Sequence, residues 1–571
     1  MTKIDPRAAI SWQARGRHFA LKVVAAAALV GCGGALAPDA SSLTEEERTA
    51  GLDAPIDRGA GPGVALLPDE RRSALAAEGV AAIPPGPADV HLNGQFGPAF
   101  NWPLIPLHTV LLPDGRVLSY GSKPDGYQGA QLHYSVWDPA LGTGGDAMQL
   151  LPNITGTDIF CAGQVLLPGS GNVLLVGGDR IVNGQRNYAN NDVNVFTPAD
   201  NALTKQAQSM AYQRWYATVI TTAAGEQAVI GGRIDRAYEG NAQYPPTDDT
   251  YASTPEMYNA ASGWRTLTTA TSDNAYGAIG QSWNYPRAWW GPHGSVVMVT
   301  PVGKIMSLDT AGAGVLTQLA PAGAVPQGAY NLPAAMYAPG KVLAVRQGGV
   351  AALVDFNGAT PAVTPTAPLS ADRQFGNATL LPDGRVWANG GSTTGNDLVG
   401  AIYGSEVWSP TTGAWTAWAS ASKPRLYHSI SMLMPDGTVL TGGGGAPGPV
   451  INLNAEIFYP PYLYKTDGSG LPAKRPVIAA APTAATWGQK IALQMATKTA
   501  MSRVTLVRFG AVTHAFNNDQ RFQDLTFTQI GKKLNVKLPA TANTAPPGFY
   551  MVFVLDAQGV PSIARVLRVG S

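Results

Sequence analysis

A short hairpin pattern recurs seven times along the chain, and this repeat limits the fold more than any other feature of the sequence. In each clear copy an apolar run leads into a glycine-containing turn, and a second apolar run leads to a glycine or a glycine pair. The clear turns are Pro113–Gly115, Pro168–Gly169, Ala224–Gly225, Pro382–Gly384 and Pro435–Gly437, and two degraded copies lie near His293–Gly294 and Pro339–Gly340.

The spacing of these hairpins predicts the architecture. Gly115 and Gly437 lie 322 residues apart, so six intervals give about 54 residues per unit, close to the ~50 residues of a kelch blade. A β-sandwich also contains hairpins, but it does not contain seven copies at similar spacing. We therefore expect a seven-bladed kelch-type β-propeller over residues 92–472.

A second structural unit follows the repeats. From residue 473 onward, apolar and polar residues alternate in short segments separated by polar turns, as expected for half-buried strands. About a hundred residues of this kind are typical of an immunoglobulin-like β-sandwich. We assign residues 473–571 to such a domain, which makes the predicted fold class all-β. The expected strands include residues 491–493, 504–507, 525–527, 534–538 and 549–555.

The first residues predict export. Basic residues precede the apolar run Val23–Val30, which is too short to span a bilayer and is typical of a signal peptide (1–37). The sequence Leu29–Cys32 matches a lipoprotein cleavage box, which would place a lipid on Cys32. Cleavage after Ala37 without a lipid is the alternative. We expect a secreted, periplasmic or cell-surface protein in which an Ala/Pro-rich tether (38–91) follows the signal.

The charge balance bears on the partners. The net charge is +1 and only 13% of the residues are charged, without a clustered Lys/Arg stripe. This composition argues against nucleic-acid binding and against electrostatic binding to a membrane surface. We expect a monomer that acts on a neutral small molecule or polymer and touches a membrane only through a lipid on Cys32.

The chain contains two cysteines, Cys32 and Cys161. Because Cys32 belongs to the leader, the mature protein is expected to have no intrachain disulfide, although export normally favours disulfides. A single thiol in an oxidising compartment is reactive unless it is buried or chemically committed. Cys161 is therefore expected to be either buried or committed to a covalent bond or a metal.

Four segments carry residues suited to one copper ion. Three of them precede blade hairpins by a few residues, so equivalent positions near the propeller axis are expected for them. Together they supply two imidazoles, two phenols and a thiol, and imidazole and phenolate suit Cu(II). The segments are Phe160–Gly163, Arg214–Thr218, Arg425–Ser429 and Thr513–His514.

These segments, in this order and spacing, resemble those of the galactose oxidase and glyoxal oxidase family of copper-radical oxidases. The resemblance runs from about Asn93 to the C-terminus. It implies that Tyr216 is an equatorial copper ligand joined through its ring to the sulfur of Cys161. It further implies that His428 and His514 are equatorial ligands and that Tyr427 is the axial ligand.

The resemblance also implies the cofactors and the reaction. One copper ion and a radical on the Cys161–Tyr216 thioether would each accept one electron from the substrate. A small alcohol, aldehyde or carbohydrate would be oxidised, Tyr427 would accept the hydroxyl proton, and O2 would be reduced to H2O2. The alternative function is a non-catalytic kelch propeller that serves as a surface-binding or structural protein.

The substrate pocket departs from the galactose oxidase pattern. Galactose oxidases commonly place a Trp over the thioether just after the glycine pair, whereas Gly232–Asp235 here contains none, so another loop would have to cover it. Tyr127 and Arg287 are the candidate substrate-binding residues. Trp215 is interpreted as an interior aromatic residue, and a structural role is expected for the remaining histidines of the mature chain, which are His91, His108, His133 and His293.

Overall fold

The computed structural model describes residues 82–570 except 183, 235–250 and 277–283. The predicted signal (1–37), Cys32 and the tether up to residue 81 lie outside the described residues. The described α-helices, α3 (Val90–Asn93) and α4 (Asp273–Tyr276), have four residues each. None of the helices in this part of the chain is long and apolar enough to cross a membrane. Single 3-10 turns are η2 (Pro139–Leu141), η3 (Gly145–Ala147), η4 (Gln347–Gly349) and η5 (Pro461–Leu463).

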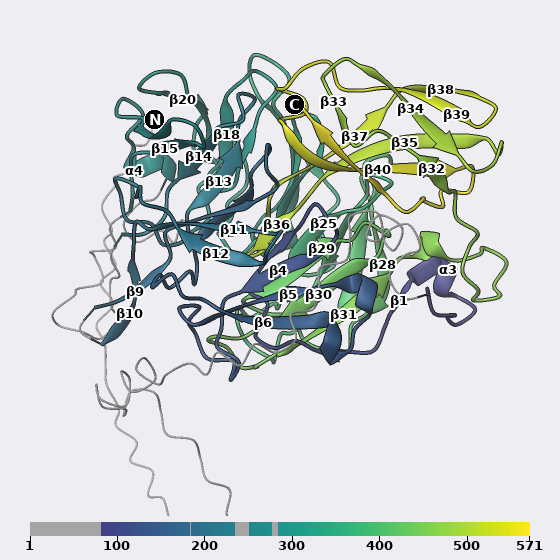
Figure 1. The fold of residues 1–571 in the computed structure, drawn as a ribbon, viewed down its shortest axis with the longest axis horizontal. Coiled ribbons are helices and arrows are strands. Elements are labelled where there is room, and N and C mark those ends of the chain that lie inside the picture. Colours follow the sequence, from purple (N-terminus) through teal and green to yellow (C-terminus); the bar gives the residue numbers. More distant parts are fainter. Residues whose placement is uncertain (1–81, 183, 235–250, 277–283, 571) are drawn as a thin grey trace, which may run out of the picture. The chain divides into compact units, whose positions relative to one another are not determined.

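Seven sets of antiparallel strands follow one another along the chain, and a hairpin of the C-terminal domain joins the first and fifth sets into one larger sheet; the chain can be followed by its colours in Figure 1. In chain order their strands are β3 (His108–Leu111), β4 (Val117–Tyr120), β5 (His133–Trp137) and β6 (Met148–Pro152); β7 (Gly163–Leu166), β8 (Val173–Val176), β11 (Val193–Thr197) and β12 (Ala202–Lys205); β13 (Thr218–Thr221), β14 (Gln227–Ile230), β15 (Glu256–Asn259) and β16 (Gly263–Thr266); β17 (Ala288–Trp290), β18 (Val296–Val299), β19 (Ile305–Asp309) and β20 (Val315–Ala320); β21 (Ala334–Ala338), β22 (Lys341–Val345), β23 (Ala351–Asp355) and β24 (Ala362–Thr366); β25 (Asn377–Leu380), β26 (Val386–Asn389), β27 (Gly404–Trp408) and β28 (Trp415–Ser420); and β29 (Ser429–Leu433), β30 (Val439–Gly443) and β31 (Asn454–Tyr459).

The first strand of each sheet lies beside the first strand of a neighbouring sheet or beside a hairpin that comes from the C-terminal domain and is described below. Direct neighbours include β7 and β13, β13 and β17, β21 and β25, β25 and β29, and β29 and β3. The first hairpin of every sheet coincides with one of the seven repeats found in the sequence. The seven-bladed propeller is therefore confirmed. A further hairpin, β9 (Asp179–Val182) and β10 (Gln185–Ala189), extends from the second blade.

The seventh blade is completed by the start of the described chain. Strands β1 (Gln95–Phe96) and β2 (Phe100–Asn101) both pair with β31, which joins the two ends of the propeller segment. Residues before them also pack here, because Gly86 N–H donates to Gly470 O at 2.8 Å and Val90 is buried. The end of the predicted tether (82–91) is thus part of the folded structure.

The C-terminal domain consists of two sheets, as predicted for an immunoglobulin-like sandwich. One sheet contains β32 (Ile478–Ala480), β34 (Lys490–Met495), β39 (Lys533–Lys537) and β38 (Phe527–Ile530). The other contains β33 (Ala484–Ala485), β41 (Arg565–Val569), β40 (Gly548–Asp556), β35 (Met501–Arg508) and β37 (Phe516–Leu525). Alternation of buried and exposed residues along β34 illustrates why this segment forms a strand with one buried face.

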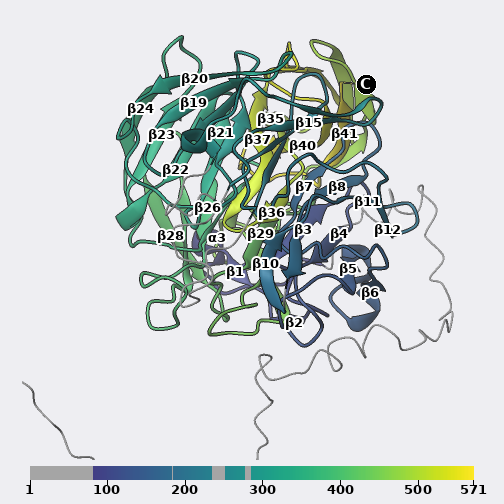
Figure 2. The same ribbon diagram turned by 90° about the vertical axis from the view of Figure 1, so that its left-hand side faces the viewer.

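One hairpin of this domain leaves the sandwich and enters the propeller, which the sequence pattern did not predict. It consists of β36 (Ala511–Thr513) and the first half of β37 (Figure 2). β36 pairs antiparallel with β3, where His108 faces Thr513, and β37 pairs parallel with β21. The hairpin therefore places His514, at its tip, among the first strands of the blades.

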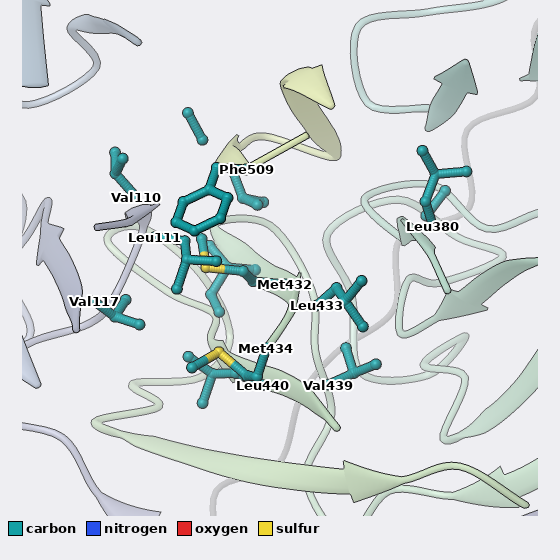
Figure 3. Close-up of a cluster of buried hydrophobic side chains, with 14 of the residues drawn as sticks. Val110, Leu111, Val117, Leu380, Met432, Leu433, Met434, Val439, Leu440 and Phe509 are labelled. Carbon is teal, nitrogen blue, oxygen red and sulfur yellow. The ribbon is translucent and has the colours of Figure 1, made fainter. Parts of the chain in front are cut away.

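A shared apolar core fixes the two domains to each other. Phe509 of the C-terminal domain lies with side chains of the first, sixth and seventh blades, such as Val110, Leu380 and Met432, in one buried cluster (Figure 3). The sandwich has a second core of its own. Burial of apolar surface stabilises the contact between the domains. The shared core therefore gives the hairpin with His514 a rigid base.

Three blades contain the same buried ion pair. Arg214 binds Glu256, Arg373 binds Glu406 and Arg425 binds Glu456, with N–O distances of 2.9, 2.7 and 2.8 Å. Each arginine also donates to the carbonyl of a glycine of its blade, namely Gly231, Gly390 and Gly443. Because Arg214 and Arg425 directly precede the segments with Tyr216 and His428, two of these pairs hold candidate metal-binding segments.

Replacing Glu256 with alanine tests this ion pair. The substitution leaves the Arg214 guanidinium buried without its counterion, so we expect the free energy of unfolding to fall by about 3–5 kcal/mol. The matched control is Asp524→Ala, which removes a solvent-exposed pair with Arg503 and should cost ~1 kcal/mol or less. Denaturant unfolding of both variants checks this, and equal losses would contradict the assignment.

Candidate metal centre

Four separate segments converge at the start of the blades. Cys161 lies in the turn before β7, Tyr216 two residues before β13, and Tyr427 and His428 directly before β29. His514 comes from the tip of the β36–β37 hairpin. All five side chains are buried or nearly so, and the structure thus brings together the residues selected from the sequence.

The backbone at these positions is strained in the same way. Cys161, Tyr216, His428 and His514 have φ values of 60°, 70°, 67° and 49°. Non-glycine residues rarely adopt positive φ, and when they do they often lie at functional sites. The first glycine of the preceding pair explains how the segments pack: a Cβ on Gly177 would lie 2.0 Å from Arg214 O. Glycine there lets the Tyr216 segment approach the preceding blade.

His428 is oriented to offer one nitrogen to a metal. Its Nδ1 lies 2.6 Å from Gly445 O, and because a carbonyl can only accept, Nδ1 carries the proton. Its buried Nε2 has no hydrogen-bond partner among the described residues. Burial lowers the pKa of His428 to about 3, so the ring is neutral. A neutral imidazole with an unused Nε2 lone pair is a ready metal ligand.

His514 approaches from the other side. Its Nδ1 lies 2.5 Å from Thr513 Oγ1, and its Nε2 lies 4.0 Å from Cys161 Sγ. Burial, with added repulsion from His428 and His108, lowers the pKa of His514 well below its usual value. One ligand-type atom each from Cys161, His428 and His514 lies within 4.8 Å of the others.

The two phenols complete the donor set. The hydroxyl groups of Tyr216 and Tyr427 contact each other directly. Burial raises the pKa of both, and Cys161 adds to the effect at Tyr216 while Tyr330 adds to it at Tyr427. A bound cation would act in the opposite direction and favour phenolate.

Cys161 lies directly against Tyr216. The Tyr216 backbone N–H donates to Cys161 O at 3.0 Å, and the thiol and the phenol are near enough for each to influence the pKa of the other. Burial raises the pKa of the Cys161 thiol well above its usual value. A thiol in contact with a phenol, beside two neutral imidazoles, is the arrangement that a cysteine–tyrosine bond next to a metal would need.

The donor set fits copper. Two neutral imidazoles, one of them with an orphaned Nε2, and two phenol oxygens match the ligands that Cu(II) prefers. His428, His514, Tyr216 and Tyr427 would hold the ion, and Cys161 lies within reach of the same point.

Trp215 covers Tyr216 in a way that sequence reasoning missed. The two rings are stacked, with centroids 3.8 Å apart and planes 14° apart. The guanidinium of Arg233 in turn lies 4.2 Å from the centre of the Trp215 ring. Arg233 directly follows the glycine pair, at the place where galactose oxidases commonly have the covering Trp, and its guanidinium packs on Trp215, which covers Tyr216 here.

Two further aromatic residues at the centre were also missed. Phe375 and Tyr285 have positive φ, 63° and 48°, like the ligand candidates. Phe375 lies 4.9 Å from Tyr427 and Tyr285 lies 5.0 Å from Tyr216, measured between ring centroids. Phe375 could have been found, because Arg373 precedes it by the same two residues that separate Arg214 from Tyr216.

The two substrate-binding candidates lie in different surroundings. Arg287 is buried and donates to backbone carbonyls, including Tyr285 O at 2.9 Å and His514 O at 3.1 Å. It therefore braces the His514 segment, and burial lowers its pKa to about 9. Tyr127 lies in the loop between β4 and β5 and is 48% exposed. For both residues the substrate contact stays a prediction.

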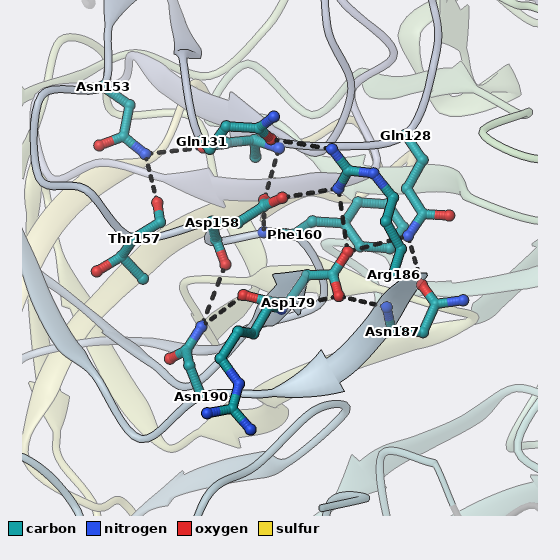
Figure 4. Close-up of polar contacts among 12 residues, drawn as sticks. Gln128, Gln131, Asn153, Thr157, Asp158, Phe160, Asp179, Arg186, Asn187 and Asn190 are labelled. Atoms are coloured by element: carbon teal, nitrogen blue, oxygen red, sulfur yellow. Dashed lines mark hydrogen bonds and ion pairs between the residues drawn. The ribbon is translucent and has the colours of Figure 1, made fainter. Parts of the chain in front are cut away.

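A polar network supports the turn that carries Cys161 (Figure 4). Arg186 joins Asp158 and Asp179, at 2.9 and 3.1 Å, and Asp158 accepts from the Phe160 backbone N–H at 3.1 Å. Burial and the charge of Asp158 raise the pKa of Asp179 to about 7. Because Phe160 adjoins Cys161, the network helps to fix the turn that carries the thiol.

Comparisons with known proteins agree with this geometry. The family model described as galactose oxidase-like, Early set domain, matches residues 475–569. Galactose oxidase of Gibberella zeae is 29% identical over 511 residues, covering 83% of this chain and 70% of that protein. Aldehyde oxidase GLOX of Vitis pseudoreticulata is 31% identical over 159 residues, covering 25% of this chain and 29% of that protein.

A solved structure is similar over most of the chain. It is that of a fungal alcohol oxidase with catalytic diversity among the AA5 family, in complex with copper. It aligns with a TM-score of 0.72 and 25% identity, covering 84% of this chain and all of the other.

The propeller, the inserted hairpin and the imidazole–phenol centre, together with these relatives, define a copper-dependent oxidoreductase that uses O2. The alternative of a non-catalytic binding propeller is thereby disfavoured. Over most of its length the chain is similar to the galactose oxidases and copper alcohol oxidases of the galactose oxidase and glyoxal oxidase family, and its last domain matches the galactose oxidase-like Early set model.

Proposed function

We propose that this protein is a copper-radical oxidase whose second redox centre is a thioether between Cys161 and Tyr216. The observation that supports it best is the convergence of Cys161, Tyr216, Tyr427, His428 and His514, from four distant segments, in one buried cluster. Direct contact between Cys161 and Tyr216 within that cluster is what distinguishes a radical site from a plain copper site.

The electron balance explains why two centres are needed. Oxidation of a primary alcohol or an aldehyde hydrate removes two electrons and two protons, and O2 takes up both to give H2O2. When bound, copper would accept one of these electrons by cycling between Cu(II) and Cu(I). The protein must supply the second acceptor, and the thioether-substituted Tyr216 ring is the group placed to do so.

The chain's own residues divide the remaining work. The oxidised Tyr216–Cys161 side chain takes a hydrogen atom from the substrate carbon, and the Tyr427 oxygen takes the hydroxyl proton. Trp215 stacks on the Tyr216 ring and excludes water from it. Neutral His428 and His514 would hold the metal without adding a proton to the site.

The relatives and the site support a substrate class. The similar proteins are named as galactose, aldehyde and alcohol oxidases, whose shared chemistry is a primary alcohol or a hydrated aldehyde. The cluster is surrounded by rings such as Trp215, Tyr330 and Phe375. We propose a small neutral substrate of this class.

Substituting Tyr427 with phenylalanine tests the proton transfer. Copper-loaded protein should release H2O2 from a primary alcohol, and Tyr427→Phe should lower that rate by about 10²–10⁴-fold. The matched control is Tyr285→Phe, a buried phenol beside Tyr216 that is not a predicted ligand, and a change of only a few-fold is expected. A variant Tyr427→Phe as active as the unmodified enzyme would contradict this role.

One observation favours a second candidate, a copper–thiolate electron-transfer centre. Cys161, His428 and His514 alone could bind copper, because their ligand atoms lie within 4.8 Å of one another, and two histidines with one cysteine are typical of blue-copper sites. That centre requires a free Cys161 thiolate and a strong visible thiolate-to-copper absorption. Detecting both in the oxidised protein would replace the radical proposal.

A further inference from the structure

His108 is a buried histidine to which the proposed reaction gives no role. It lies in β3, its side chain is fully buried, and its Nε2 lies 3.1 Å from the backbone nitrogen of Cys161. An amide N–H can only donate, so Nε2 must be the acceptor and the ring must be neutral with its proton on Nδ1. Burial favours this state, because it lowers the pKa of His108 well below the usual value.

This contact acts on a strained turn. Cys161 has a φ of 60°, and the turn is closed by the Ala162 N–H, which donates to Ile159 O at 3.1 Å. Asp158 holds the turn on one side through Phe160 N–H, and Tyr216 N–H holds Cys161 O on the other. His108 is the partner of the Cys161 amide itself, so it fixes the direction in which the thiol leaves the backbone.

His108 also connects this turn to the inserted hairpin. Its ring stacks on Tyr120, with centroids 4.5 Å and planes 7° apart, which prevents rotation of the imidazole. In the β3–β36 pair His108 lies opposite Thr513, the neighbour of His514, and its ring centroid is 5.7 Å from that of His514. One side chain therefore sets the position of Cys161 relative to a predicted copper ligand.

We propose that His108 is a positioning residue for the self-processing step that joins Cys161 to Tyr216. In that step the thiol S–H bond and one ring C–H bond of Tyr216 are broken and a C–S bond is formed. Two electrons and two protons leave the side chains and reduce one O2 to H2O2 at the copper-loaded centre. This role rests on the proposed function, since it requires the thioether to form.

The rate of cross-linking tests the role of His108. Protein prepared without copper is mixed with Cu(II) in air, and the fraction that becomes lighter by two hydrogen atoms is followed by mass spectrometry. His108→Phe keeps a flat ring on Tyr120 but loses the acceptor, and it should cross-link at least about tenfold more slowly. His108→Gln keeps an acceptor at about the position of Nε2 and should recover most of the rate, whereas the shorter His108→Asn should not.

Measuring copper binding by the variants shows whether His108 positions Cys161, binds the metal or is needed for folding. All three variants should bind Cu(II) with unchanged stoichiometry, and the control His293→Phe, at the turn between β17 and β18, should cross-link at the normal rate. Normal cross-linking in both His108→Phe and His108→Asn would overturn the role of His108 alone, as would loss of copper binding in His108→Gln. Absence of cross-linking in the unmodified chain would overturn the proposed function and this role with it.

Discussion

Replacing Cys161 with serine should abolish most of the oxidase activity while leaving copper in place. Serine cannot form the thioether, so the Tyr216 ring would lose the substituent that makes its one-electron oxidation accessible. We expect the rate of substrate oxidation to fall by about a thousandfold or more, which corresponds to ~4 kcal/mol of activation free energy. H2O2 release by the copper-loaded variant, compared with the unmodified enzyme, measures the loss.

Copper content is the control for this substitution. The predicted ligands Tyr216, Tyr427, His428 and His514 are all retained in Cys161→Ser, so the variant should still bind one Cu(II) ion. Full activity in the serine variant would contradict the radical mechanism. Loss of copper together with activity would instead indicate that Cys161 is a ligand, as in the copper–thiolate alternative.

The second large effect is expected at His514. His514→Ala removes a predicted ligand from the hairpin tip and should lower copper affinity by more than the ~10–100-fold that changes around a ligand usually cause. The matched control is Thr513→Val, which removes only the hydroxyl 2.5 Å from His514 Nδ1, and a loss of about tenfold is expected. Competition with a copper chelator measures both, and equal affinities in the His514→Ala and unmodified proteins would contradict this ligand assignment.

The repeats made most of the fold predictable from the sequence. Each Asp-Gly turn of the repeats, such as that at Asp383–Gly384, connects two strands because its glycine adopts the positive φ that the turn requires. The seven hairpins and the alternating C-terminal segments are local patterns, and local patterns are what a sequence displays directly. The excursion of β37 from the sandwich into the propeller was not predictable in this way, because pairing with β21 is a contact between distant segments.

The residues of the candidate centre also fall into those that the sequence predicts and those that depend on contacts between distant segments. Tyr216, Tyr427, His428 and His514 were found because their chemical types suit copper and their segments match known ones. For Trp215 the sequence predicts only an interior aromatic residue, because the ring on which it stacks is not displayed by the residue types. His108 was set aside because its contact is with a backbone amide of another blade, and a sequence carries no signal for such a contact.

The central claim is the covalent bond between Cys161 and Tyr216, and the intact mass of the protein tests it most directly. The chain is loaded with Cu(II) in air, denatured, treated with a thiol-alkylating reagent and weighed beside copper-free protein. The proposed mechanism predicts a mass lower by two hydrogen atoms and no alkylation of Cys161. An unchanged mass with Cys161 fully alkylated would contradict it.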